Sequence, residues 1–379
     1  MDEASQWLSH QLPAMEAALA ALVDVNSFTG NRDGGRKVGE LLVEVFRMPG
    51  LEAEVVDSAR YAPHLVFRSA GRADAKPVGL LGHLDTVFPP GVFEGYRVDG
   101  ERRRGPGVYD MKGGLVVVAW ALKALAVTGG LGRVPPLRLV VVSDEEEGSP
   151  DGAGVIHRVL AGCGAALDFE PGRGNDAIVT QRSGTGSVRV QARGKAAHAG
   201  NAYWDGANAI WALSRFVDRA QQLSLKDTGV TVNVGLVKGG TARNTVPAEA
   251  EALVDVRAPT VATFEAVMTG LSDAAEDLGV PGVHLELERL TLRPPMERTA
   301  ESLALCESYS DCARRHGLGG GEAPRQGGAS DGNTTSAMGI PTIDALGPRG
   351  GGYHTPDEFI FVDTLVPRAA ALADWLLGR

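Results

Sequence analysis

An acidic run that follows a hydrophobic stretch is the first place in this sequence where chemistry could occur. Glu145 and Glu146 lie in the run Ser-Asp-Glu-Glu-Glu-Gly at 143–148, directly after the aliphatic stretch 137–142. That stretch predicts a buried parallel strand, and open α/β sheets bind ligands at the carboxyl ends of their strands. Adjacent carboxylates there can divide the work, because one can bind a metal ion while the next transfers protons. The run alone favours a solvated acidic turn.

Further candidate residues fall at other expected strand ends or in the loops that follow them: His83, Asp110, Glu170 and His354. Each has a structural alternative when it is taken alone. His83 could belong to a capped strand end, and Asp110 could cap a helix N-terminus, a position that aspartate favours strongly. Glu170 could be a turn residue before a proline, and a single histidine such as His354 is more often structural than a metal ligand.

Taken together, these residues point to a metal centre. One aspartate bridging two ions, with a histidine and a carboxylate completing each side, is the ligand count of a dinuclear zinc site, whose ions lie roughly 3.5–4 Å apart. Oxygen and imidazole ligands without thiolate also allow cobalt or manganese. Asp85 lies two residues after His83, so both side chains project to the same side of a strand. The Asp85 carboxylate could accept the second N–H of a metal-bound imidazole.

Composition limits the possible partners and compartments. A formal net charge of −10 and a pI near 5.4 argue against a nucleic-acid partner, which would need a basic surface. No window of about 18 consecutive apolar residues is present, so no membrane span is expected. The N-terminus lacks the features of a signal peptide, and the three cysteines share no CxxC spacing. We therefore expect a cytoplasmic protein that acts on a small molecule and has no cysteine zinc site.

The chain is long enough for two domains, since 379 residues exceed the usual size of one hydrophobic core. Its first half alternates strands and helices, which predicts an α/β fold with a largely parallel sheet. The expected elements are an amphipathic helix at 4–23, strands at 51–56, 64–67 and 78–81, a buried helix at 115–127, a strand at 137–142, a helix at 153–161 and a strand at 165–169. The basic run Arg102–Arg104 is expected in a solvated loop.

From about 184 to 294 the expected order changes to strand-helix-strand-strand-helix-strand, which is typical of a small ferredoxin-like domain. The α/β pattern resumes after 298, with a glycine-rich loop at 317–328, a short strand at 340–343 and a closing helix at 366–377. We therefore expect a catalytic domain formed by residues 1–183 and 295–379, with an inserted α+β domain at 184–294.

Six motifs in fixed order resemble those of the M20 family of dinuclear zinc exopeptidases and deacylases. They are HLDT at 83–86, GPGVYDMKGG at 105–114, SDEEEGS at 143–149, FEP at 169–171, KAAHAG at 195–200 and GGGYHTPDEF at 350–359. The resemblance covers nearly the whole chain and, within the family, is greatest to the glutamate carboxypeptidases. It implies a zinc-exopeptidase-like catalytic domain, and it implies that the inserted domain is a lid that also forms a homodimer.

The resemblance also implies a role for each residue of the site. His83 and Glu170 would complete one zinc site, Glu146 and His354 the other, and Asp110 would bridge the two ions. Glu145 would be the general base, and Asp85 would hold the His83 imidazole.

In the lid, His198 matches a family histidine that stabilises the oxyanion, often across a dimer. Asn244 and Arg257 match positions that bind the substrate carboxylate. Gly328 lies in a loop that resembles the family's glycine-rich substrate loop, although Ala329 replaces a frequent glycine.

The implied reaction is hydrolysis of the amide bond to an amino acid that bears a free α-carboxylate. An N-acyl amino acid deacylase, of the acetylornithine or succinyl-diaminopimelate deacylase kind, is the alternative within the family. A relative that keeps the fold but only binds metal or ligand is an alternative of a different class, and retention of Glu145 and of every expected ligand argues against it.

Overall fold

The computed structural model describes residues 3–379, which divide into two compact units. The first unit comprises the described chain up to Thr180, together with Arg298–Arg325 and Ser330–Arg379. The second unit comprises Gln181–Glu297 and Gln326–Ala329. The second unit is therefore an insertion in the first, and each is described by itself below.

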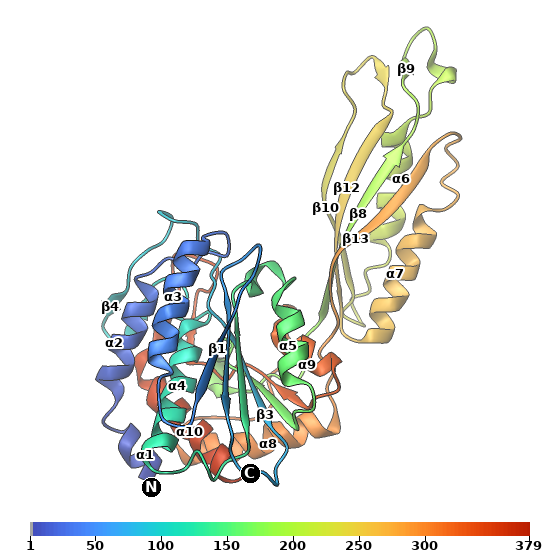
Figure 1. The fold of residues 1–379 in the computed structure, drawn as a ribbon. Coiled ribbons are helices and arrows are strands. Elements are labelled where there is room, and N and C mark those ends of the chain that lie inside the picture. Colours follow the sequence, from blue (N-terminus) through green and yellow to red (C-terminus); the bar gives the residue numbers. More distant parts are fainter. Residues whose placement is uncertain (1–2) are drawn as a thin grey trace. The chain divides into compact units, whose positions relative to one another are not determined.

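The first unit is built on a mixed sheet with the strand order β1-β2-β6-β3-β7-β14 (Figure 1). Strands β6, β3, β7 and β14 are parallel to one another, whereas β2 runs antiparallel to both β6 and β1. The strand bounds are Glu52–Val56 for β1, His64–Ser69 for β2, Val78–His83 for β3, Leu137–Val142 for β6, Ala165–Asp168 for β7 and Thr342–Ile343 for β14. This confirms the expected mostly parallel sheet.

Hydrophobic cores lie on both faces of this sheet, because successive strand residues point to opposite sides. Leu139 and Val141 of β6 pack into the larger core with α4, whereas Val140 and Val142 pack into a smaller core with α5. Helix α4 is buried along most of its length, as its nearly continuous apolar sequence predicts. The helix bounds are Arg32–Val45 for α3, Lys112–Val127 for α4, Gly152–Leu160 for α5, Ala300–Arg315 for α8, Asp331–Ala337 for α9 and Leu365–Leu377 for α10.

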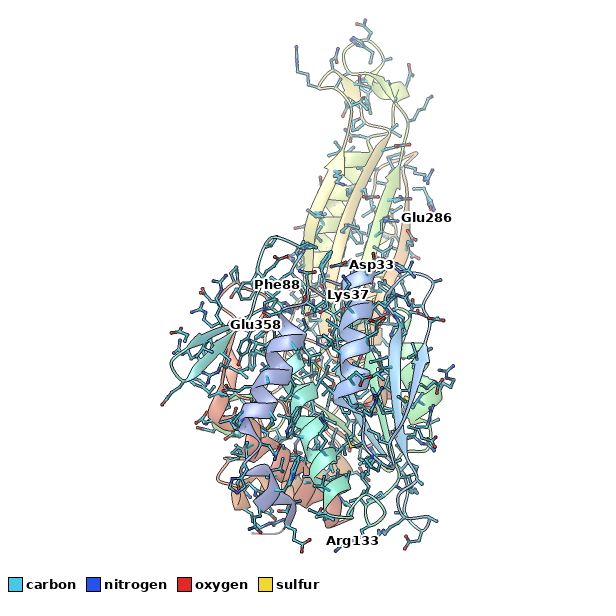
Figure 2. The ribbon with its side chains drawn as sticks, turned by 60° about the vertical axis from the view of Figure 1, so that its left-hand side comes forward. Asp33, Lys37, Phe88, Arg133, Glu286 and Glu358 are labelled. Atoms are coloured by element: carbon cyan, nitrogen blue, oxygen red, sulfur yellow. The ribbon has the colours of Figure 1, made fainter. Side chains whose placement is uncertain are left out.

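Helix α3 presents its charged residues to solvent and its small and aliphatic residues to the protein. Asp33 and Lys37, one helical turn apart, are both exposed on it (Figure 2), whereas Val38 and Leu42 are buried. Within residues 3–379, no helix combines the length and the apolar composition that crossing a membrane requires.

Two local expectations are wrong. The single helix expected at 4–23 is divided into α1 (Glu3–Leu8) and α2 (Leu12–Val23), because Pro13 fits the first turn of a helix but not its interior. The run Arg102–Arg104 forms strand β5 instead of a solvated loop. It pairs with β4 (Arg97–Asp99) and β16 (Phe359–Phe361), and the Arg102 guanidinium lies 4.3 Å from the centre of the Phe359 ring.

The second unit has the expected order of elements, β8-α6-β10-β12-α7-β13, and the antiparallel sheet order β10-β12-β8-β13. Buried residues alternate with partly exposed ones along β8 and β12, and the buried side chains pack against α6 and α7. This confirms the ferredoxin-like insertion. The bounds are Gly184–Arg193 for β8, Ala209–Gln221 for α6, Thr231–Gly239 for β10, Glu249–Ala258 for β12, Val261–Ala275 for α7 and His284–Arg293 for β13.

Candidate metal centre

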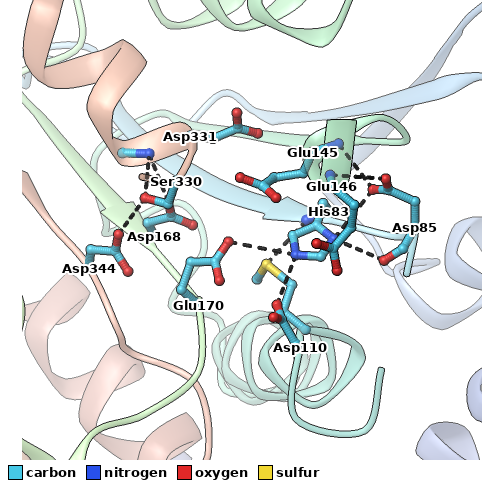
Figure 3. A network of polar contacts seen from close by, with 12 residues as sticks. His83, Asp85, Asp110, Glu145, Glu146, Asp168, Glu170, Ser330, Asp331 and Asp344 are labelled. Carbon is cyan, nitrogen blue, oxygen red and sulfur yellow. Dashed lines mark hydrogen bonds and ion pairs between the residues drawn. The ribbon is translucent and has the colours of Figure 1, made fainter. Parts of the chain in front are cut away.

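The carboxyl ends of three adjacent parallel strands bring the acidic and histidine side chains together. His83 is the last residue of β3, Glu145 and Glu146 lie in the short 3-10 helix η1 (Glu145–Glu147) after β6, and Glu170 follows β7 by two residues. Because β3 lies between β6 and β7 in the sheet, these positions meet at one edge. Figure 3 shows their side chains gathered there, with Asp110 beside them at the start of α4.

Asp110 lies between two imidazoles and faces one with each carboxyl oxygen. Its Oδ1 is 3.1 Å from His83 Nε2, and its Oδ2 is 3.3 Å from His354 Nε2. His83 Nε2 is also 3.6 Å from Glu170 Oε1, and His354 Nε2 is 3.1 Å from Glu146 Oε2. The side chains therefore form two histidine–carboxylate pairs with one aspartate between them.

This arrangement removes two of the structural alternatives. The N-cap of α4 is Met111 and not Asp110. Glu170 is only 7% exposed, so it is not a solvated turn residue. His354 is the most open member of the group, with 48% of its side chain accessible to solvent.

The pKa values of the group indicate an excess of negative charge in a buried place. Burial raises the pKa of Glu146 to about 8, and burial and the nearby Asp110 carboxylate raise the pKa of Glu170 well above its usual range. Burial would also raise the pKa of Asp110, but hydrogen bonds with His354 and His83 outweigh it and hold that pKa below the usual range. Hydrogen bonds with Asp110 and Glu146 raise the pKa of His354 to about 10.

These residues fit divalent cations. Potential ligand atoms of His83, Asp110 and Glu146 lie within 4.8 Å of one another, and so do those of His83, Glu145 and Glu170. The donors are imidazole nitrogens and carboxylate oxygens, which suit zinc, cobalt and manganese. Cations would neutralise buried carboxylates that otherwise take up protons.

Asp85 makes more contacts than the sequence predicted. Its carboxylate is 1% exposed and lies 3.3 Å from His83 Nδ1, although that nitrogen is also 3.0 Å from the Asp85 backbone carbonyl. The carboxylate accepts a hydrogen bond from the Thr29 hydroxyl at 2.7 Å. It also accepts the backbone N–H groups of Glu145 and Glu146, both at 3.2 Å. Asp85 therefore connects the end of β3 with the acidic turn.

Two neighbours hold the two ends of that acidic turn. Asp144 Oδ2 accepts the backbone N–H groups of Asp151, at 2.8 Å, and Gly152, at 3.0 Å, where α5 begins. Glu147, which is exposed, accepts hydrogen bonds from the Tyr61 hydroxyl at 2.8 Å and from Arg60 at 2.9 Å. Sequence reasoning missed Tyr61, because nothing in its local sequence marks a contact 86 residues away.

The sequence-predicted residues of the second unit do not all lie together. His198 and Asn244 are neighbours, since His198 pairs with Thr245 and the Ala199 N–H donates to the Asn244 carbonyl. Arg257 lies near the far end of β12, about 26 Å along the strand from its start at Glu249. Its guanidinium is bound to Asp255 at 2.8 and 3.0 Å.

Gly328 belongs to the short return segment of the second unit, and its carbonyl oxygen accepts a hydrogen bond from Arg182 at 3.1 Å.

Comparison with known proteins agrees with the fold and with the motifs. Residues 180–283 match the M20 peptidase dimerisation domain. Carboxypeptidase G2 of Pseudomonas sp. (strain RS-16) is 29% identical over 378 residues, which cover 98% of the chain and 90% of that protein. Acetylornithine deacetylase of Myxococcus xanthus is 30% identical over 275 residues, which cover 66% of the chain and 68% of that protein.

Solved structures share the fold across almost the whole chain. Aminopeptidase PepT of Bacillus cereus ATCC 10987 has a TM-score of 0.80 at 22% identity, and the match covers 97% of the chain and 98% of that structure. The YXEP protein of Bacillus subtilis, described as a dinuclear metal binding peptidase from the M20 family, has a TM-score of 0.73 at 16% identity. That match covers 97% of the chain and 98% of that structure.

The chain belongs to the M20 peptidase family, whose members are metal-dependent hydrolytic enzymes. The resemblance drawn from its motifs is thereby confirmed.

Proposed function

We propose that this enzyme hydrolyses the amide bond to a C-terminal amino acid that bears a free α-carboxylate, as a glutamate carboxypeptidase does. The observation that carries the proposal is the position of Asp110 between two histidine–carboxylate pairs, with the Glu145 carboxylate beside them. The similarity to carboxypeptidase G2 over 98% of the chain supports the same substrate class.

Two divalent ions per subunit, zinc with cobalt or manganese as substitutes, would be held by the five side chains of the centre. His83 and Glu170 would hold one ion, Glu146 and His354 the other, and Asp110 both. When bound, such ions polarise a substrate carbonyl and lower the pKa of a water molecule.

Side chains of the protein transfer the proton, position the metal ligand and bind the substrate. Glu145 accepts a proton from the attacking water and later donates it to the leaving amine. The Asp85 carboxylate holds the His83 ring and the backbone of the acidic turn. His198 stabilises the developing oxyanion, and Asn244, Arg257 and the loop at Gly328 bind the substrate carboxylate. Because Asn244 and Arg257 lie towards opposite ends of β12, the two would come from different subunits of a homodimer.

Glu145→Gln tests the assignment of the base. Its carboxylate lies near His83 and Glu170, so it could instead be a metal ligand. If Glu145 is the base, the variant keeps a near-normal metal content and loses activity. Loss of metal from the variant would reassign Glu145 as a ligand. Glu54→Gln is the matched control, because Glu54 is an exposed glutamate that pairs with Arg68 on the same unit.

A deacylase of N-acyl amino acids is the second candidate, and the 30% identity to acetylornithine deacetylase favours it. A hydrolysis screen of acyl-amino acids with C-terminal Glu, Asp, Lys, Gly and aromatic residues, with zinc or cobalt supplied, separates the two. Activity on N-acetylornithine but not on acyl-glutamates would replace the first proposal by the second. Bound metal without turnover on any of these substrates would support a non-hydrolytic relative.

We also propose that the second unit forms a homodimer. It matches the family's dimerisation domain, and its strand β10 lies at an edge of the sheet, where a strand can pair with another chain. The N–H groups of Val232 and Val234 are taken by Ser224 and Gln221, so the pairing would use the later part of β10. Leu236 and Val237 on β10 are 55% and 56% exposed. Light scattering after size exclusion should give twice the chain mass, and Leu236→Lys should shift it towards the monomer. A wild-type monomer at assay concentrations would contradict this proposal.

A further inference from the structure

Glu358 is a buried carboxylate that lies outside the candidate ligand set. It is 1% exposed and follows His354 by four residues. Figure 2 labels its position in the first unit. Its Oε1 accepts the backbone N–H groups of Tyr109 at 2.8 Å and Asp110 at 3.0 Å, and its Oε2 accepts that of Gly107 at 3.2 Å. One carboxylate thus receives three donors from the segment that carries the central aspartate of the metal centre.

The segment between β5 and α4 also has buried Val108 and Tyr109 side chains, and the Tyr109 hydroxyl donates to the Gly172 carbonyl at 2.6 Å, but the backbone N–H groups of Gly107, Tyr109 and Asp110 go to Glu358. Pairing between β5 and β16 joins Arg104 to Phe359 and does not extend to Asp110, six residues further along the chain. The segment turns sharply, with Gly107 at φ +76°, where a Cβ atom would lie 2.8 Å from the Thr86 side chain. Carboxylate acceptors bind backbone N–H groups more strongly than neutral acceptors do, so Glu358 fixes the path of the backbone up to Asp110.

The second loop of the metal centre is fixed by the same residue. His354 and Glu358 belong to one connection, between β15 (Gly350–Gly351) and β16. A displacement of Glu358 would therefore move His354 and Asp110 relative to each other. Their facing atoms are only 3.3 Å apart, so a small displacement would change whether one ion could contact both.

We propose that Glu358 is a positioning residue of the metal centre, which holds the Asp110 segment against the His354 loop so that both side chains can bind the same ion. This inference rests on the proposed function, because it concerns the metal-binding geometry of that site. Glu358 itself contacts backbone N–H groups and acts through Asp110 and His354.

Two substitutions of Glu358 test this proposal, because they remove one or both of its acceptor oxygens. Glu358→Gln keeps one acceptor oxygen and places an NH₂ group against at least one of the three N–H donors. Glu358→Leu keeps a similar volume and removes both acceptors. Asp357→Asn is the matched control, because Asp357 is the adjacent acidic residue, its side chain is 86% exposed, and it pairs with Arg104.

The main readout is the dissociation constant of zinc, measured by competition with a chelator, in protein that circular dichroism shows to be folded. Loss of a residue that orients a metal ligand typically weakens metal binding about 10- to 100-fold. We expect zinc binding to weaken about 10-fold in Glu358→Gln and about 100-fold in Glu358→Leu, and to stay unchanged in Asp357→Asn. The absorption spectrum of the cobalt-loaded protein should change in Glu358→Gln, and added metal should restore part of its kcat.

A purely structural role predicts a different pattern, in which the melting temperature of metal-stripped protein falls while zinc affinity and the cobalt spectrum of folded protein stay at wild-type values. That pattern would overturn the proposal. If Glu358→Leu does not fold, Glu358→Gln decides by the same measurements. Failure of the proposed function is recognised separately, because the wild-type protein would then bind no zinc or hydrolyse none of the acyl-amino acids.

Discussion

Metal binding at this site should release protons, and the affinity for metal should therefore rise with pH. His354 has a pKa of about 10 and Glu146 a pKa of about 8 when protein groups alone surround them. The facing atoms of Glu146 and His354 are 3.1 Å apart, and at pH 7 the pair holds at least one proton, which must leave before both side chains become ligands. To test this, the metal is removed with a chelator, and the stripped protein is titrated with zinc at pH values between 6 and 8.5.

The size of the pH effect on zinc affinity follows from the pKa values of His354 and Glu146. An ion that contacts both side chains displaces at least one proton near pH 7, so its apparent affinity should rise at least about tenfold per pH unit there. Up to pH 8.5 His354, with a pKa of about 10, still holds a proton, so the slope should not fall below about tenfold per unit in that range.

Isothermal titration calorimetry in buffers of different ionisation enthalpy counts these protons directly. His316→Gln is the control, because His316 pairs with Asp374 at 3.2 Å, outside the metal centre, and its loss should leave the proton count unchanged. His354→Gln should lower the count by about one for the ion bound there. A zinc affinity that does not change with pH, or binding without proton release at pH 7, would refute the assignment of His354 and Glu146 as ligands.

Metal-stripped protein should lose thermal stability as the pH rises, because the folded pKa values of Glu146 and His354 exceed their ordinary values of 4.5 and 6.5. The resulting stabilisation is complete below those ordinary values and is lost as the pH rises through about 8 for Glu146 and about 10 for His354. The melting temperature should therefore fall between pH 6 and 9 in metal-stripped protein but not in metal-loaded protein. Asp85→Asn should lower zinc affinity or kcat about 10- to 100-fold, and a wild-type value for both would contradict its role. Tyr61→Phe removes one hydrogen bond to Glu147, and such a bond is worth about 1.5–3 kcal/mol when the partner is charged and less near solvent. Urea unfolding should therefore show a loss of stability at or below that range. An unchanged stability would mean that this bond does not hold the turn.

Much of the fold follows from local sequence patterns. The aliphatic runs at 78–81 and 137–142 become β3 and β6 because both faces of the sheet are covered, and such strands are hydrophobic on both sides. Helix α3 was not predicted, because Gly34, Gly35 and Gly39 lower its helix propensity. Gly35 is needed by packing, since a Cβ atom there would lie 2.6 Å from Ala62.

The metal-centre residues were predictable because each follows a recognisable strand or lies in a recognisable motif. The spacing indicated that Asp85 could hold His83, but the other contacts that hold these residues were not predictable. Glu358 contacts residues 248–251 positions earlier in the chain, and Asp85 contacts Glu145 and Glu146 across 60 and 61 positions. No periodicity or spacing indicates such pairs, because they form only when the loops at one end of the sheet have been assembled. Arg102–Arg104 was misread for a related reason, since its strand depends on pairing with residues near the C-terminus.

Buried carboxylates in this unit thus serve two different purposes, and the hydrogen bonds separate them. Asp85 and Glu358 accept N–H and O–H donors of the protein and so hold the backbone beside the candidate centre, although burial still raises the pKa of Glu358 to about 7. Glu146 and Glu170 face His354 and His83, and burial raises the pKa of Glu146 to about 8 and that of Glu170 well above its usual range, so these groups bind protons unless a cation replaces them. A carboxylate whose oxygens accept backbone N–H groups holds the backbone in place. A buried carboxylate that faces a histidine can instead bind a metal ion. The two classes together would let an acidic cluster this deeply buried remain folded and still bind the divalent ions that we propose.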